Sequence, residues 1–318
     1  MIEGVTVSIM ILTYNQEQWI RQTLDSILAQ KTTYSYEVII GEDCSTDGTH
    51  AICEEYVEKY ANFFLAPQTH NLGLIGNWAN CAKYMSGKYH MGCAGDDYWT
   101  NPDKIQMQVD YMEQHPECVI CHTDYDLVHV STGKIERSYN VLHKICPPQG
   151  KIQMEIRRGK ANISAGTQCT RAEVAEKYVP FEKFVELEFP REDWPTQLIL
   201  SKYGEIHYLP IATTAYRVGQ ESITNMLDYD KIRKKYEKDY VMAKFLYDLF
   251  PEWGPMDQGT KDYYEQHVYH GLLLAAYRNN DYRSARQFRH QDPTHSKLRM
   301  MAYTRLTFQV MRWCLNRE

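Results

Sequence analysis

The sequence predicts an α/β protein whose mainly parallel, doubly wound sheet carries helices on both faces. Two observations support this fold class. Short apolar runs alternate with amphipathic segments over the first hundred residues, and brief polar stretches separate them. This alternation is typical of strand–helix–strand units, which build parallel sheets. The 318 residues are also enough for one large domain, or for a medium domain with an appendage.

Four strands are predicted in this first part of the chain. Each is a run of apolar, often β-branched residues that is too short for a helix and suits a strand buried on both faces. We expect them at Val5–Leu12, Glu37–Gly41, Phe63–Ala66 and Tyr89–Ala94.

Four helices are predicted to follow these strands in turn. Asn15 is expected to cap the first, with Gln18 placed three residues later as in a capping box. The turn residues 45–48 open the second helix. The third runs through Trp78 to Met85, and the fourth starts at Asn101-Pro102, since proline is favoured in a first turn.

The remainder of the chain divides into two regions. Short strands and long loops are predicted from Asp124 to Ile223, and a helical pattern from Leu227 onward. We therefore predict a domain over residues 1–226, with halves at about 1–125 and 126–226, and a helical region over 227–318. The expected C-terminal helical segments are Asp230–Phe250, Lys261–Arg278, Tyr282–Gln291 and Ser296–Leu315.

Composition excludes several classes of protein. Lys and Arg number 35 against 41 Asp and Glu, a net charge of −6, so we expect no nucleic-acid partner. No apolar stretch approaches the length of a membrane span, and no basic, signal-like N-terminus is seen. Nine scattered cysteines fit free thiols in a reducing cytoplasm. Cys118 and Cys121 have haem- or zinc-like spacing, but no partner ligands follow, and we interpret them as core residues of a strand.

Polar residues cluster where the predicted strands end. Tyr14 and Asp43 follow the first and second strands, and Asp96-Asp97 follow the fourth. Ligands of such sheets bind beyond the carboxyl ends of the strands. Two adjacent acids repel each other and are costly to desolvate, and a divalent cation carrying a phosphate-bearing ligand is the simplest compensation.

Three motifs in this order carry a family resemblance. Residues 7–15 (VSIMILTYN), 42–49 (EDCSTDGT) and 95–99 (GDDYW) resemble the family 2 glycosyltransferases, and the likeness extends over roughly residues 5–225. It implies the GT-A fold of nucleotide-diphospho-sugar transferases, with the helical C-terminal region outside it.

The resemblance also implies roles for the residues at the strand ends. Tyr14 would stack on a uracil-type base, and Asp43 would accept a hydrogen bond from the imide N–H of that base. Asp97 would ligate Mn²⁺ or Mg²⁺ on the diphosphate, and Asp96 would contact the ribose or a metal-bound water. Oxygen ligands and a diphosphate suit such hard cations.

Two later residues complete the expected site. Asp193, in Glu192-Asp193-Trp194, matches the family's catalytic base, which deprotonates the acceptor hydroxyl; the alternative is a helix cap. Arg217, expected just after a strand, matches a segment near the diphosphate, where a guanidinium suits phosphate. Many relatives have a histidine two residues later, whereas this chain has Gly219, and a surface role for Arg217 stays open.

These roles imply an inverting, metal-dependent transferase that moves a sugar from a UDP- or dTDP-sugar to a hydroxyl of a glycan or lipid-linked glycan in cell-surface polysaccharide synthesis. The alternatives are a nucleotidyltransferase of related fold and a degenerate nucleotide-sugar- or glycan-binding protein. The C-terminal helices are expected to pack on the catalytic domain, to form a homodimer, or to contact the inner face of the membrane as a peripheral surface. The membrane alternative rests on apolar and basic residues of the last helix: Leu306, Val310, Trp313, Cys314, Arg305, Arg312 and Arg317.

Overall fold

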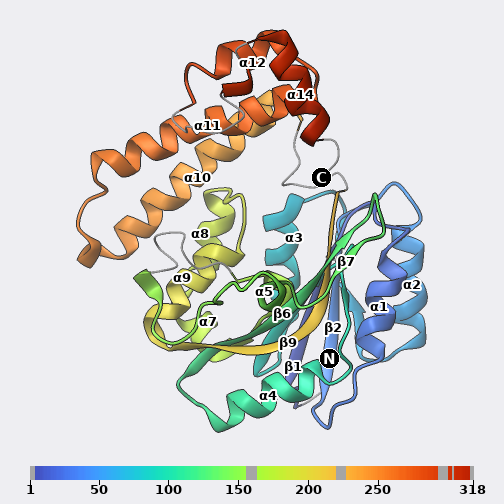
Figure 1. The fold of residues 1–318 in the computed structure, drawn as a ribbon. Coiled ribbons are helices and arrows are strands. Elements are labelled where there is room, and N and C mark those ends of the chain that lie inside the picture. The colour runs from blue at the N-terminus through green and yellow to red at the C-terminus, as the bar shows by residue number, and fades with distance from the viewer. Residues whose placement is uncertain (1–3, 155–162, 220–226, 293–299, 303, 316–318) are drawn as a thin grey trace. The chain divides into compact units, whose positions relative to one another are not determined.

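The computed structural model of the protein describes residues 4–154, 163–219, 227–292, 300–302 and 304–315 (Figure 1). The chain divides into two compact units. The first comprises Met1–Glu186 and Arg191–Val218, and the second comprises Leu187–Pro190 and Gly219–Glu318. The predicted domain boundary, at residue 226, falls in residues 220–226 and therefore lies outside the described residues.

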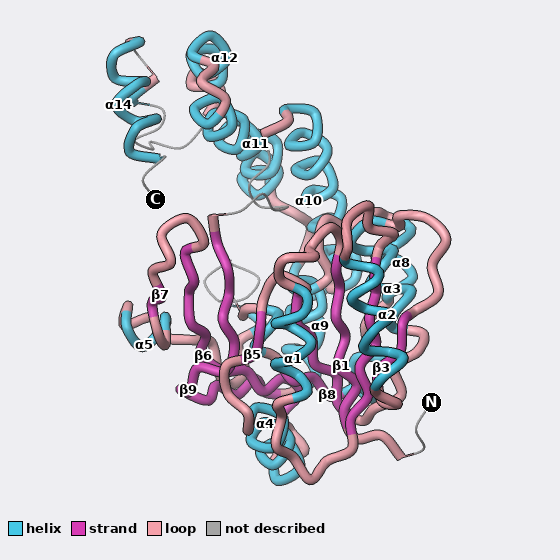
Figure 2. The backbone as a smooth tube through the Cα atoms, turned by 90° about the vertical axis from the view of Figure 1, so that its right-hand side faces the viewer, coloured by secondary structure: helices cyan, strands magenta, loops and turns pink. Residues whose placement is uncertain are grey.

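One mixed sheet organises the first unit (Figure 2). Its strands follow the order β3-β2-β1-β4-β8-β6-β9-β5, with β7 paired to β6. Strands β1 to β4 contain the parallel pairs β1–β2, β1–β4 and β2–β3, and β6–β9 is also parallel. The pairs β4–β8, β6–β8, β5–β9 and β6–β7 are antiparallel. The strands are β1 Val7–Thr13, β2 Tyr36–Glu42, β3 Phe63–Leu65, β4 Tyr89–Ala94, β5 Tyr98–Trp99, β6 Cys118–His129, β7 Ile135–Glu136, β8 Cys169–Arg171 and β9 Glu205–Val218.

Helices cover both faces of this sheet, as the sequence predicts. Ile9 and Ile11 of β1 pack in one core with side chains of α1, α2 and α4, whereas Met10 packs on the opposite face with α3. This split follows from the alternation of side chains along a strand. The helices of the unit are α1 Ile20–Leu28, α2 Thr49–Lys59, α3 Gly73–Ala82, α4 Lys104–Gln114, α5 Tyr139–Leu142, α7 Ala172–Tyr178, α8 Phe181–Glu186 and α9 Asp193–Tyr203, with a 3₁₀ turn η1 at Ala165–Thr167.

Several local predictions were wrong. Asn15 does not cap α1, which begins at Ile20. Its φ of 52° is left-handed, and its side-chain oxygen accepts the N–H of Thr46 instead. Similarly, α4 begins at Lys104, two residues after Pro102. Of the strands after residue 117, β7 and β8 are short as predicted, whereas β6 and β9 are long. Arg217 lies within β9 instead of after it.

The second unit is helical. It contains α10 Tyr229–Leu249, a 3₁₀ turn η2 at Pro251–Trp253, α11 Gln258–Arg278, α12 Tyr282–Phe288 and α14 Arg305–Leu315. Asp228 caps α10 by accepting the N–H groups of Asp230 and Lys231. The core is made of side chains from these helices, among them Leu272, Leu273, Tyr277, Phe288 and Phe308.

The two faces of α14 differ. Phe308 is buried, whereas Leu306, Val310 and Cys314 are exposed, so the apolar face considered for a membrane is present. Arg317, the side chain of Trp313 and the start of the predicted segment at residue 296 lie outside what the structure describes. Among the described residues, no helix combines the length and the apolar character needed to cross a membrane.

Candidate active site

The loops that follow β1, β2 and β4 meet at one edge of the sheet. These three strands are neighbours and run parallel, so their carboxyl ends coincide. Backbone hydrogen bonds extend this pairing into the loops: Asp43 donates to the carbonyl of Thr13 (3.0 Å), and Gly95 donates to that of Leu12 (2.9 Å). The residues predicted at strand ends are therefore brought together.

Helix α1 holds the acid-containing turn after β4 through the side chain of Thr23. The hydroxyl of Thr23 lies within hydrogen-bonding distance of two carbonyl oxygens of this turn, those of Gly95 (2.9 Å) and Asp97 (2.6 Å). Gly95 is required by a close approach, since a Cβ there would lie 2.5 Å from the Thr13 hydroxyl. These contacts hold the turn so that Asp96 and Asp97 lie at the sheet edge.

Asp97 is a carboxylate with little compensation from the protein. The residue is only 6% exposed. Its burial, together with the neighbouring charge of Asp96, raises the pKa of Asp97 to about 8. The backbone N–H of Arg217 donates to its Oδ1 (2.9 Å), and Oδ2 accepts no hydrogen bond from any residue that the structure describes. This arrangement suits a carboxylate whose charge is balanced by a bound cation.

Arg217 braces this turn rather than pointing away from it. Its guanidinium lies between the rings of Trp19 and Tyr98, 4.5 and 4.6 Å from their centroids. It donates to the carbonyl of Asp96 and to the side chain of Gln22. The residue is buried, so the predicted surface alternative for Arg217 is wrong. Its predicted contact with the diphosphate stays a prediction.

Asp43 is oriented by groups on the neighbouring loop. Its Oδ1 accepts hydrogen bonds from the backbone N–H of Leu72 (2.7 Å) and from the side-chain amide of Gln68. Among the described residues, none donates to Oδ2. The carboxylate is buried and directed by two donors, so one oxygen is left to accept from a ligand. Tyr14 is 46% exposed at the end of β1, as a ring that stacks on a base would have to be.

Glu42, to which the sequence assigns no role, shapes the loop that carries Asp43. Its buried carboxylate accepts the N–H of Ser45 (2.6 Å) and bonds the Nδ1 of His50 (2.8 Å). Cys44, between these groups, has a left-handed φ of 56°. Glu42 therefore fixes a turn that the residue types alone do not specify.

Asp193 is the first residue of α9, and its Oδ1 accepts the N–H of Trp194 (2.7 Å). Burial raises the pKa of Asp193, and burial with the adjacent Asp193 charge raises the pKa of Glu192 to about 7. Burial also raises the pKa of the Tyr216 phenol, with further increases from the negative charges of Asp97, Asp96 and Asp193. Tyr216 thus lies within electrostatic reach of the acids after β4 and of the acid on α9.

The donor set also fits the predicted cation. Among the described residues, no three His, Cys, Asp or Glu side chains form a metal site. Asp96 and Asp97 therefore offer two carboxylates at most, which is how Mg²⁺ is commonly held, with substrate phosphates and water as the other ligands. A cation bound in this way would depend on the phosphate-bearing ligand.

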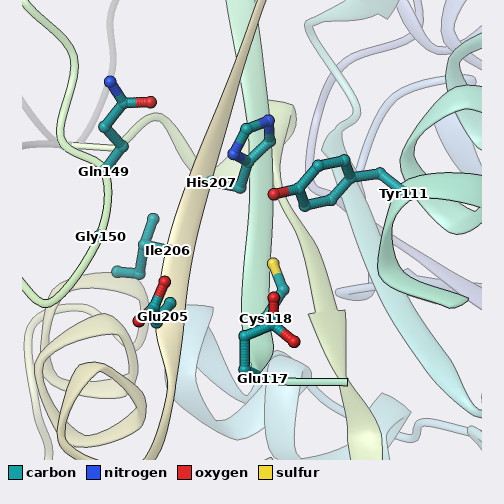
Figure 3. A pocket seen from close by; sticks show the side chains of 8 residues that line it. All are labelled: Tyr111, Glu117, Cys118, Gln149, Gly150, Glu205, Ile206 and His207. Atoms are coloured by element: carbon teal, nitrogen blue, oxygen red, sulfur yellow. The ribbon is translucent and has the colours of Figure 1, made fainter. Parts of the chain in front are cut away.

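A separate pocket of about 240 Å³ opens at the other end of β6 and β9 (Figure 3). Glu205 pairs with Cys118 there, whereas Arg217 pairs with Val128 at the acid end. Tyr111 and His207 stack along one wall with ring centroids 3.7 Å apart. None of the predicted site residues lines this pocket.

Sequence reasoning missed the residues that orient the site. Thr23 of α1 contacts the acid turn, and Gln22 of α1 and its N-cap residue Trp19 contact Arg217. Gln68 reaches Asp43 from the loop after β3. Their helical or loop pattern carries no signal of this, because each acts through a contact with a distant segment.

Residues 8–178 match the model of the family described as "Glycosyl transferase family 2". The chain belongs to this family. It is 43% identical over 117 residues to an uncharacterised protein of Mycobacterium bovis, and this alignment covers 36% of this chain and 34% of that protein. It is 37% identical over 94 residues to a poly(ribitol-phosphate) beta-glucosyltransferase of Bacillus spizizenii, which covers 29% of this chain and 15% of that enzyme. These alignments span about a third or less of the relatives' length.

Solved structures of similar shape cover nearly the whole chain of this family 2 member. S. aureus TarS 1–349 in complex with UDP-GlcNAc aligns with a TM-score of 0.53 and 16% identity, over 97% of this chain and 89% of that one. The mannosyltransferase PcManGT of Pyrobaculum calidifontis, in complex with GDP-Man and Mn²⁺, aligns with a TM-score of 0.54 and 13% identity, over 98% and 86%. At these identities the likeness concerns the fold, and the predicted GT-A fold is confirmed.

Proposed function

We propose that this family 2 member is an inverting, metal-dependent glycosyltransferase. It transfers a sugar from a UDP- or dTDP-sugar to a hydroxyl of a glycan or lipid-linked glycan. The observation that carries the proposal is that the loops of Asp43 and of Asp96-Asp97 meet at the carboxyl edge of the sheet, and that Asp193 acts with Asp96 and Asp97 on the pKa of Tyr216. Two of these acids fit a cation and diphosphate, and the third fits a base.

Each residue has a chemical task in this proposal. Tyr14 stacks on the base and Asp43 accepts from its imide N–H, which favours uracil or thymine over cytosine. Asp193 takes the proton of the acceptor hydroxyl while the oxygen of that hydroxyl forms a bond to the anomeric carbon. The bond from this carbon to the diphosphate breaks, and the nucleoside diphosphate leaves from the opposite face, so the configuration inverts.

The raised pKa of Asp193 supports its role, because a more basic carboxylate accepts a proton more readily. Asp96 and Asp97 would hold the cation, which supplies neutralisation of the leaving diphosphate. Support for this cation and for a nucleotide-sugar donor comes from the fold neighbours, since the structure of PcManGT is a complex with GDP-Man and Mn²⁺ and that of TarS is a complex with UDP-GlcNAc.

A place in cell-surface polymer synthesis is proposed from the likeness to the poly(ribitol-phosphate) beta-glucosyltransferase. Peripheral contact with a membrane and a homodimer remain proposals for the exposed face of α14. We propose the cytoplasm, at the inner face of the membrane, as the location of the protein.

A screen of nucleotide sugars tests the proposal. Release of UDP or dTDP from one donor, dependent on Mn²⁺ or Mg²⁺ and increased by a glycan acceptor, is the expected result. Release of pyrophosphate from a nucleoside triphosphate and a sugar phosphate would instead identify a nucleotidyltransferase. Glycan or nucleotide-sugar binding without turnover of any donor would identify a binding protein.

A further inference from the structure

A short segment of the first unit exposes aliphatic side chains on a firm support. It comprises residues 135–145, from β7 through α5, and we name it the α5 platform. Val141 and Leu142 are 56% and 55% exposed, and Ile135 and Ile145 are also exposed. A four-residue helix is not stable by itself, so its support must come from neighbouring elements.

Two buried carboxylates of β6 provide that support. Asp124 accepts the N–H groups of Asn140 (3.0 Å) and Val141 (3.2 Å). Asp126 accepts the N–H of Ser138 (2.8 Å) and the guanidinium of Arg137 (3.0 Å). Burying a carboxylate is costly unless donors compensate it, and here the platform supplies the donors. Two buried acids, Asp124 and Asp126, thus hold the solvent-exposed apolar platform in place.

Ring contacts connect the α5 platform with the candidate active site. Strand β8 pairs with β6 at Ile120 and Cys121, and β7 pairs with β6 at Leu127 and Val128. Helix α5 lies beside β6 (Figure 1) and is bonded to Asp124, between these two pairings. Tyr139 stacks on Tyr125 with centroids 5.2 Å apart, and Tyr125 meets Tyr216 edge-on at 6.3 Å. Tyr216 precedes Arg217, whose backbone N–H donates to Asp97 at the acid turn.

We propose that the α5 platform binds the hydrocarbon chain of a lipid-linked acceptor, whose sugar lies over Tyr125 and Tyr216 with its hydroxyl next to Asp193. This inference rests on the proposed function and names its acceptor class. Aliphatic side chains gain by covering hydrocarbon and offer no hydrogen bond to the hydroxyls of a glycan. The aromatic path leads from them to the acids, as one acceptor molecule with an apolar and a sugar end requires.

Charge on the platform fits the same ligand. The chain carries a net charge of −6, yet Arg137 and Lys144 lie on either side of the exposed Val141 and Leu142 in the sequence. The side chain of Arg137 is 74% exposed, and Lys144 has no acidic partner among the described residues. Cations beside an apolar surface suit the phosphate that joins a sugar to a lipid.

A pair of acceptors that differ only in their aglycone tests this inference. With the donor found in the nucleotide-sugar screen, methyl and decyl glycosides of one sugar are compared. We expect the KM of the decyl glycoside to be roughly tenfold lower or more, because its chain buries several methylene groups. In the double variant V141E/L142E this advantage should be lost, while the KM of the methyl glycoside and the hydrolysis of the donor by water stay unchanged.

Val185→Glu, an exposed aliphatic residue on α8, is the matched control and should keep the decyl preference. If no nucleotide sugar is turned over, the proposed function fails, and this inference fails with it. If turnover occurs without a decyl preference, or the preference survives in V141E/L142E, only the acceptor surface is refuted. Loss of binding to lipid vesicles in V141E/L142E, with the decyl preference intact, would also refute it and identify a membrane-contact face.

Discussion

Asp43→Asn should exchange the base preference of the nucleotide site. In the structure, Oδ1 of Asp43 accepts from Leu72 (2.7 Å) and from Gln68, whereas Oδ2 accepts from no described residue. An asparagine here must keep its oxygen at the Oδ1 position to satisfy the same two donors. Its NH₂ group then replaces Oδ2, so the group that faces the base changes from an acceptor to a donor.

The size of the effect follows from these contacts. Uracil presents its imide N–H to this position, and a hydrogen bond to a charged group contributes about 1.5–3 kcal/mol. The variant loses this bond, and its NH₂ group faces the imide N–H of uracil. Two donors that face each other and find no acceptor cost about 1–3 kcal/mol more. UDP should therefore bind on the order of a hundredfold more weakly, or worse. Cytosine has an acceptor at the same ring position, so CDP should bind the variant better than it binds the parent protein.

Isothermal titration of UDP and CDP in the presence of Mn²⁺ measures both changes. Asp47→Asn is the matched control, because Asp47 lies in the same loop and accepts the N–H groups of Thr49 (3.0 Å) and Glu17 (3.2 Å). That variant should keep the UDP preference. Equal loss of UDP and CDP in Asp43→Asn, or unchanged UDP binding, would show that Oδ2 does not face the base.

Three further outcomes are expected. Asp97→Ala should abolish the dependence of UDP binding on Mn²⁺, measured by titration with and without the ion, and a surviving dependence would place the cation elsewhere. Asp193→Asn should bind UDP normally but release it from the donor about 10²–10⁴ times more slowly, and normal turnover would exclude Asp193 as the base. Lys104 is fully buried, and burial lowers its pKa to about 8, so the unfolded chain binds more protons than the folded protein between pH 8 and 10.5. In urea denaturation, the free energy of unfolding of the parent protein should therefore increase by about 2 kcal/mol relative to that of Lys104→Met as pH rises from 7 to 9.5. A difference between the two proteins that does not change with pH would contradict the lowered pKa.

The strands around the site could be predicted from the sequence with little error. Tyr89–Ala94 is observed as β4 with the same ends, and Val5–Leu12 is shifted by two residues at its start and one at its end. Both runs are apolar and locally bounded by turn residues, and burial on both faces of a parallel sheet needs no further information. The predicted helix cap at Asn15 is wrong because it depends on a contact between distant segments. The side chain of Asn15 accepts a hydrogen bond from Thr46 of another loop instead of capping its own helix.

The site was predicted in part, by a different route for each residue. Tyr14, Asp43 and Asp97 lie at the carboxyl ends of neighbouring parallel strands, and chain order with strand alternation is enough to bring such ends together. Arg217 was expected in a loop, but β9 extends through it and turns its guanidinium between Trp19 and Tyr98. No local pattern encodes that sandwich.

The fold class, the family likeness and the acids at the strand ends could be predicted from the sequence, because periodicity and motif order are local properties of the chain. The way those acids are held depends on the tertiary structure. Gln68 orients Asp43, Asp193 and Asp97 both act on the pKa of Tyr216 although they are almost a hundred residues apart, and Asp124 holds the α5 platform. Hydrogen bonds and charge–charge interactions between distant segments depend on how the chain folds, and they form only once the sheet has brought these segments together.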